Sequence, residues 1–184
     1  MLRVAEHFRA AKLHLVGLSM GGRIARNVAL RSPERLHSLV LVSTSPGFDA
    51  LSTDQVTRFV TERRSSTPQT LRRLLGSGAD PAAYEELADS VARVHHASFP
   101  TTLEASVAQD RAAPIEGISV PTLVMAGEED TVYPPELARE MARRIPGAEL
   151  CIFERTGHLA NLEQPDKFNQ VVLDFITRSQ ERQS

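Results

Sequence analysis

Short apolar runs are separated, in both the first and last parts of the chain, by segments whose apolar residues recur at helical spacing. Continuous runs of leucine and β-branched residues are typical of strands buried on both faces, as in a parallel sheet. They predict strands over 13–18, 39–42, 122–126 and 150–153. The helical spacing predicts helices over 4–11, 21–30, 135–144 and 165–178. This alternation predicts an α/β fold with a mainly parallel sheet flanked by helices.

Residues 46–113 have a different pattern, without any run typical of a strand. Prolines and the turn Gly76-Ser77-Gly78 separate charged segments with helical spacing. These segments predict helices over 53–64, 68–75, 81–96 and 101–111. We therefore predict a helical insertion between two parts of one α/β core, residues 1–45 and 114–184.

The composition is that of an ordinary globular domain, and its charge is nearly balanced. The chain has 184 residues, 41% hydrophobic and 24% charged, with a formal net charge of −2, which gives no electrostatic reason to expect nucleic acid or an anionic membrane as a partner. Cys151 is the single cysteine, which excludes an internal disulfide and a multi-cysteine metal site. Without an apolar run typical of a signal peptide or membrane span, we expect a soluble, cytoplasmic protein.

The first predicted strand is followed directly by Gly17-Leu18-Ser19-Met20-Gly21 and then by a predicted helix. A G-x-S-x-G motif between a strand and a helix is typical of a sharp turn that presents a nucleophilic serine. We expect the glycines on both sides of Ser19 to remove side chains that would collide in this turn. The N–H of Met20 would then be one donor to an oxyanion. The alternative interpretation is a structural glycine-rich turn.

Acidic residues follow the third strand, and a histidine follows the fourth. Glu128, Glu129 and Asp130 offer carboxylates that could orient a histidine, or they could form a solvated loop before the next helix. Of the six histidines, His158 is the one at the carboxyl end of a predicted strand. Serine, acid and histidine in this order, each after a different strand, favour nucleophilic catalysis in which the histidine activates the serine.

Together these motifs make the sequence resemble the capped serine hydrolases of the α/β-hydrolase superfamily. The resemblance rests on VGLSMGG at 16–22, VPTLVMAGEED at 120–130 and GHLANLEQP at 157–165. It implies that Ser19 is the nucleophile, His158 the base and Asp130, rather than Glu128 or Glu129, the acid. It further implies that residues 46–113 form a cap, that the substrate is a small ester or lactone, and that no metal or organic cofactor takes part. The last two motifs are most similar to 3-oxoadipate enol-lactonase-type esterases and lactonases.

The sequence departs from this family before the nucleophile turn. Only 18 residues precede Ser19, whereas family members carry several strands there and a His-Gly loop that supplies a second oxyanion donor. The chain thus resembles the C-terminal portion of a hydrolase, and its first strand is expected to be an unpaired apolar edge, open to self-association. The alternative function is a non-catalytic remnant that binds a ligand or associates with itself. Acyl transfer and amide cleavage by the same residues also stay open.

Overall fold

The computed structural model describes residues 2–47, 67–93 and 114–182. Within these ranges no helix is both long enough and apolar enough to cross a membrane. Two of the helices predicted in the insertion, over 53–64 and 101–111, lie outside the described residues.

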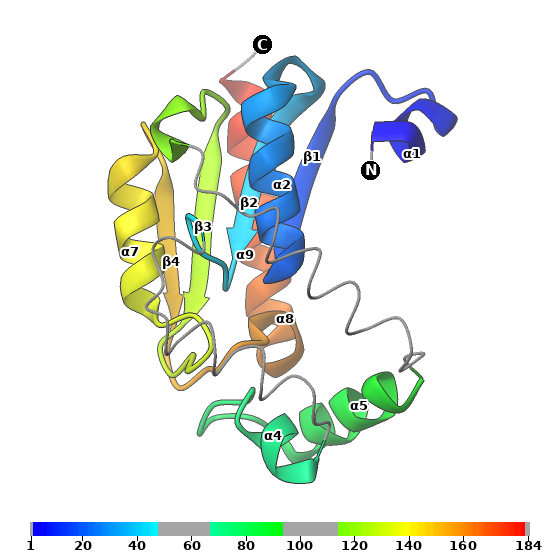
Figure 1. Ribbon diagram of the computed structural model, residues 1–184, viewed down its shortest axis with the longest axis vertical. Helices are drawn as coiled ribbons and strands as arrows, with labels where there is room; N and C mark the ends of the chain where they lie inside the picture. Colours follow the sequence, from blue (N-terminus) through cyan, green and yellow to red (C-terminus); the bar gives the residue numbers. More distant parts are fainter. Residues whose placement is uncertain (1, 48–66, 94–113, 183–184) are drawn as a thin grey trace.

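The predicted strands form one parallel sheet (Figure 1). Its four strands, in the spatial order β1-β2-β3-β4, are β1 (Leu13–Leu18), β2 (Leu36–Val42), β3 (Thr122–Gly127) and β4 (Glu149–Phe153). The register pairs Leu18 with Val42 and Val42 with Met125, and Gly127 with Phe153. The carboxyl ends of all the strands therefore meet at one edge of the sheet, which is where ligands bind in such folds.

Helices cover both faces of this sheet, and each face has its own apolar core (Figure 1). Leu39 and Leu41 of β2 belong to the core under α2 (Met20–Arg31) and α7 (Pro135–Arg144). Val40 and Val42 belong to the other core, under α8 (Ala160–Glu163) and α9 (Pro165–Glu181). Successive side chains of a strand point to opposite faces, so two covered faces require the continuous apolar runs seen in the sequence.

The first helix is shorter than its sequence pattern predicts. We expected a helix over 4–11, but α1 comprises Leu2–His7. The backbone N–H of Ala10 donates to the carbonyl of Ala5 at 2.9 Å, and Arg9 has a φ of 52°. A left-handed residue of this kind closes a helix, because the chain can no longer continue the helical turn.

In the sheet formed by the described residues, β1 lies at one side. Within the described part of the chain it pairs with β2 alone. Val16, in the middle of β1, is 43% exposed, whereas Val40, its partner in β2, is fully buried. Such an edge leaves backbone N–H and C=O groups open to another strand. Self-association through β1 stays a prediction.

Residues 67–93, the main described part of the predicted insertion, contain helices and lie beyond the carboxyl ends of the strands (Figure 1). It contains α4 (Pro68–Arg72) and α5 (Pro81–Ala92). Both helices begin with proline after a capping residue: the side chain of Thr67 accepts the N–H of Thr70, and that of Asp80 accepts the N–H of Ala82. A capping side chain followed by proline is a common helix start, and both helices of this segment begin in this way.

Candidate active site

Ser19 lies in a strained turn between β1 and α2. Its φ of 55° and ψ of −117° are rare for any residue other than glycine. The Ser19 N–H donates to the carbonyl of Val42 at 2.9 Å, and the Ser19 carbonyl accepts the hydroxyl of Thr44 at 2.8 Å. The end of β2 and the loop after it thus hold the turn in place. Met20 begins α2, so its N–H belongs to the helical turn whose N–H groups have no partner within the helix.

The two glycines of the motif do not serve the same purpose. A Cβ added to Gly17 would collide with the Gly21 carbonyl and lie 2.8 Å from the Cβ of Ala25. A Cβ added to Gly21 would meet no atom within 4 Å, so the expectation that Gly21 avoids a collision is wrong. The second crowded position is Gly22, where an added Cβ would lie 2.7 Å from the Cβ of Thr44. Close packing of α2 against β1 and the loop after β2 sets these requirements.

Asp130 is brought directly to His158. The Nδ1 atom of His158 lies 2.9 Å from Oδ2 of Asp130, and both side chains are buried. The other oxygen of Asp130, Oδ1, accepts the N–H groups of Val132 and Tyr133 at 2.8 and 2.9 Å. These two bonds fix the carboxylate, so the imidazole meets a rigid acceptor.

The neighbouring acids have other partners. The Glu128 carboxylate accepts the N–H of Arg155 at 3.1 Å. The Glu129 carboxylate accepts the N–H and the hydroxyl of Ser77 at 2.6 and 2.7 Å. Glu128 and Glu129 are exposed and Asp130 is buried, so the three carboxylates have different partners and only Asp130 binds His158.

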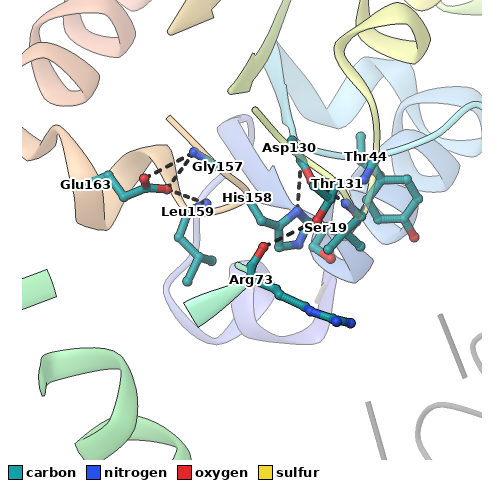
Figure 2. A network of polar contacts seen from close by, with 11 residues as sticks. Ser19, Thr44, Arg73, Asp130, Thr131, Gly157, His158, Leu159 and Glu163 are labelled. Atoms are coloured by element: carbon teal, nitrogen blue, oxygen red, sulfur yellow. Dashed lines mark hydrogen bonds and ion pairs between the residues drawn. The ribbon is translucent and has the colours of Figure 1, made fainter. Parts of the chain in front are cut away.

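His158 is held on several sides. Its N–H donates to the carbonyl of Leu74 at 2.8 Å, and the ring of Tyr133 stacks on its imidazole with centroids 5.8 Å apart. Tyr133 is 1% exposed. Tyr133 was not predicted to be part of the site, although its place three residues after Asp130 in the same loop was a usable signal. Figure 2 shows Ser19 in the same polar cluster as His158 and Asp130.

The other histidines lie elsewhere in the fold. His14 and His37 stack on one another at the beginnings of β1 and β2, with centroids 5.1 Å apart. His7 ends α1 beside Phe8. His95 and His96 lie outside the described residues. Among the histidines that the structure describes, His158 is therefore the one that lies at this site.

The pKa of the Asp130 carboxyl lies below its ordinary value. Burial by itself raises this pKa, but the charge of His158 and the hydrogen bonds from His158, Tyr133 and Val132 lower it by more. The site thus favours the ionised carboxylate, which is the form that accepts the Nδ1 proton of a histidine.

The stabilising contribution of this carboxylate is expected to disappear in acid. A carboxyl with a depressed folded pKa stabilises the fold fully above its unfolded pKa of about 3.9, and loses this effect as the pH falls through the folded value. Urea unfolding of wild type and Asp130→Asn, between about pH 6 and about pH 3, should show a difference in unfolding free energy that shrinks toward acid. A difference independent of pH would contradict the depressed pKa.

The fold and this site define an α/β protein with a strained serine turn and a buried histidine–carboxylate pair at the carboxyl edge of its sheet. The chain belongs to the alpha/beta hydrolase family, whose family model matches residues 2–171. The family expected from the motifs is thereby confirmed.

Relatives and solved structures agree with this membership. The 2-hydroxy-6-oxononadienedioate/2-hydroxy-6-oxononatrienedioate hydrolase of Escherichia coli K12 is 31% identical over 189 residues, covering 95% of this chain and 66% of the relative. The enol-lactonase from Burkholderia xenovorans LB400 superimposes with a TM-score of 0.79 at 26% identity, over 96% of this chain and 70% of its own. A thermophilic esterase from Thermogutta terrifontis gives a TM-score of 0.82 at 24% identity, over 96% and 69% of the two chains, and shows the shared fold.

Proposed function

We propose that this chain carries the catalytic residues of a serine hydrolase that cleaves a small carboxylic ester or lactone. The observation that carries the proposal is the buried contact between His158 Nδ1 and Asp130 Oδ2. It lies at the same edge of the sheet as the strained turn of Ser19. A carboxylate that accepts the proton on Nδ1 makes the other ring nitrogen, Nε2, the unprotonated one, and an unprotonated nitrogen is the base that a serine nucleophile requires.

The proposed reaction has two steps. The Ser19 hydroxyl oxygen attacks the carbonyl carbon while Nε2 of His158 takes its proton, and the oxyanion receives a hydrogen bond from the Met20 N–H. The C–O bond to the leaving group then breaks, and His158 returns the proton to the departing alkoxide. In the second step His158 deprotonates water, which attacks the acyl carbon. The bond from this carbon to the Ser19 oxygen breaks, His158 returns the proton to that oxygen, and the acid is released. In a lactone, the leaving alkoxide stays part of the product.

The substrate class is proposed from the similarity to the Burkholderia enol-lactonase and from the motifs at 120–130 and 157–165. The chain spans 66% of the length of the Escherichia coli relative, whose name gives 2-hydroxy-6-oxononadienedioate and 2-hydroxy-6-oxononatrienedioate as its substrates. Acyl transfer and amide cleavage would use the same Ser19 and His158. Esters, lactones and amides of matched acyl groups, assayed side by side, would separate amide cleavage from ester or lactone cleavage.

A fluorophosphonate is expected to add once to the folded chain and not to add to Ser19→Ala. The probe reacts with an activated serine rather than with any exposed one, because its attack needs a base at the hydroxyl. Intact mass after incubation measures the adduct, and peptide mapping should place it on Ser19.

Ser43→Ala is a matched control for this experiment. Ser43 follows β2 at the same edge of the sheet and is 1% exposed, and its hydroxyl makes no hydrogen bond within the described residues. This variant should keep the adduct. An unlabelled but folded wild-type chain would overturn the proposal and favour the binding or self-associating remnant.

A further inference from the structure

The carboxylate of Glu163 joins two segments that are far apart in the sequence. Its Oε2 accepts the N–H of Gly76 at 2.6 Å, across 87 residues of chain. The same carboxylate accepts the N–H of Gly157 at 3.0 Å and that of Leu159 at 3.3 Å (Figure 2). Gly157 and Leu159 are the residues on either side of His158. Glu163 therefore touches both neighbours of His158 and the turn that follows α4.

The two segments also meet backbone to backbone. A Cβ added to Gly76 would lie 2.6 Å from the nitrogen of Gly157, and one added to Gly157 would lie 2.6 Å from the Leu74 carbonyl oxygen. Both glycines therefore permit a crossing that any side chain would prevent. The N–H of His158 completes the contact, since it donates to the same Leu74 carbonyl.

We propose that Glu163 is a positioning residue that couples the docking of segment 67–93 to the position of His158. The inference rests on the proposed function for its catalytic consequence, but its structural part stands on these contacts alone. Every N–H from Gly157 to Leu159 is bonded either to Glu163 or to segment 67–93. If the segment with Leu74 and Gly76 moves away from this loop, Glu163 loses the N–H of Gly76, and the N–H of His158 loses the Leu74 carbonyl. The imidazole of His158 is then less well fixed in the position from which it would accept the proton of Ser19.

A carboxylate suits this role because it only accepts hydrogen bonds. Its two oxygens face three N–H donors, and bonds to an ionised acceptor are about twice as strong as neutral ones. Glu163→Gln keeps the shape of the side chain but replaces one acceptor by an NH₂ group. That group faces N–H donors, so at least one donor loses its partner.

Glu129→Gln is the matched control, because Glu129 binds the same turn by a different route. Its carboxylate holds Ser77, the residue after Gly76, and accepts no N–H of the histidine loop within the described contacts. Both variants remove one charge and weaken the turn at 76–78. Only Glu163→Gln also removes the acceptor beside His158.

The experiment combines amide hydrogen exchange with fluorophosphonate labelling of the full chain. In Glu163→Gln we expect faster exchange at 76–78 and at 157–159 together, and a 10- to 100-fold lower maximal labelling rate at unchanged half-saturation, since small misplacements of reacting groups have effects of this size. In Glu129→Gln the Glu163 carboxylate still binds Gly76 and both neighbours of His158, so we expect the faster exchange to be confined to 76–78 and the maximal rate to stay within about twofold of wild type. Thermal unfolding confirms that each variant is folded.

Unchanged exchange at 157–159 in Glu163→Gln, or a wild-type labelling rate, overturns the coupling. A general loss of stability without a positioning role would not lower the maximal rate at constant half-saturation. If wild type itself is not labelled, the proposed function fails, while hydrogen exchange still decides whether Glu163 joins the two segments. If Glu163→Gln does not fold, Glu163→Asp, which keeps the charge but is shorter by one methylene, takes its place with the same expected exchange pattern.

Discussion

Replacing Asp130 with asparagine is expected to slow the reaction of Ser19 by about 10⁴-fold, although the side chain keeps its size. Asparagine can still use its oxygen to accept the N–H groups of Val132 and Tyr133, which bind Oδ1 in the wild type. Its amide nitrogen then faces Nδ1 of His158 in place of Oδ2 and donates to it. Nδ1 must in that case be the unprotonated nitrogen, so Nε2 carries the proton and cannot accept one from Ser19.

The rate of fluorophosphonate adduct formation, followed by intact mass, measures this effect. Glu128→Gln is the control from the same loop, because the Glu128 carboxylate binds the N–H of Arg155 rather than His158. It should react at nearly the wild-type rate, because the contact between Asp130 and His158 stays in place. If folded Asp130→Asn reacts at the wild-type rate, Asp130 does not set the tautomer of His158.

Replacing Gly17 with alanine is expected to destabilise the fold by about 2–4 kcal/mol. The new Cβ would collide with the Gly21 carbonyl and lie 2.8 Å from the Cβ of Ala25. Most of these atoms belong to the backbone of the nucleophile turn and of α2, so no flexible side chain can move away. Either α2 shifts away from β1 or the turn at Ser19 changes shape, and both weaken the site.

Gly21→Ala is the matched control for Gly17→Ala. It adds the same methyl group within the same motif, where nothing lies within 4 Å of the new atom. Because Gly21 lies in α2, alanine should leave stability unchanged or raise it by about 0.5–1 kcal/mol. Urea unfolding measures both variants. Equal losses would show that the crowding at Gly17 does not determine the stability of the turn.

The order of the elements was predictable because buried positions are apolar, and the spacing of apolar residues differs between strands and helices. The β2 run from Leu39 to Val42 is apolar at every position, since Leu39 and Leu41 face one core and Val40 and Val42 the other. The helix over 135–144 was predicted with the bounds that α7 has. The end of α1 was not predictable in this way, because it depends on the backbone conformation of Arg9, a residue with no strong turn preference.

The residues of the candidate site were predictable to a different degree. Ser19 and His158 follow strands whose carboxyl ends must meet at one edge of a parallel sheet, so the strand pattern singled them out. Spacing alone did not choose between Asp130 and its two acidic neighbours. The structure separates them, because the loop directs Glu128 to Arg155, Glu129 to Ser77 and Asp130 to His158.

By itself, the sequence determined the α/β class and the order of strands and helices. It also singled out Ser19 and His158, which follow two of those strands. These features follow from periodicity and from turn chemistry, which act between neighbours along the chain. Only the tertiary structure decided which carboxylate orients His158, which glycines are sterically required, and that Glu163 binds Gly76 as well as the loop of His158. The contacts of Asp130 with His158, of Gly22 with Thr44 and of Glu163 with Gly76 join residues far apart in sequence. The partner of a carboxylate is whichever donor the packed fold brings within hydrogen-bonding distance.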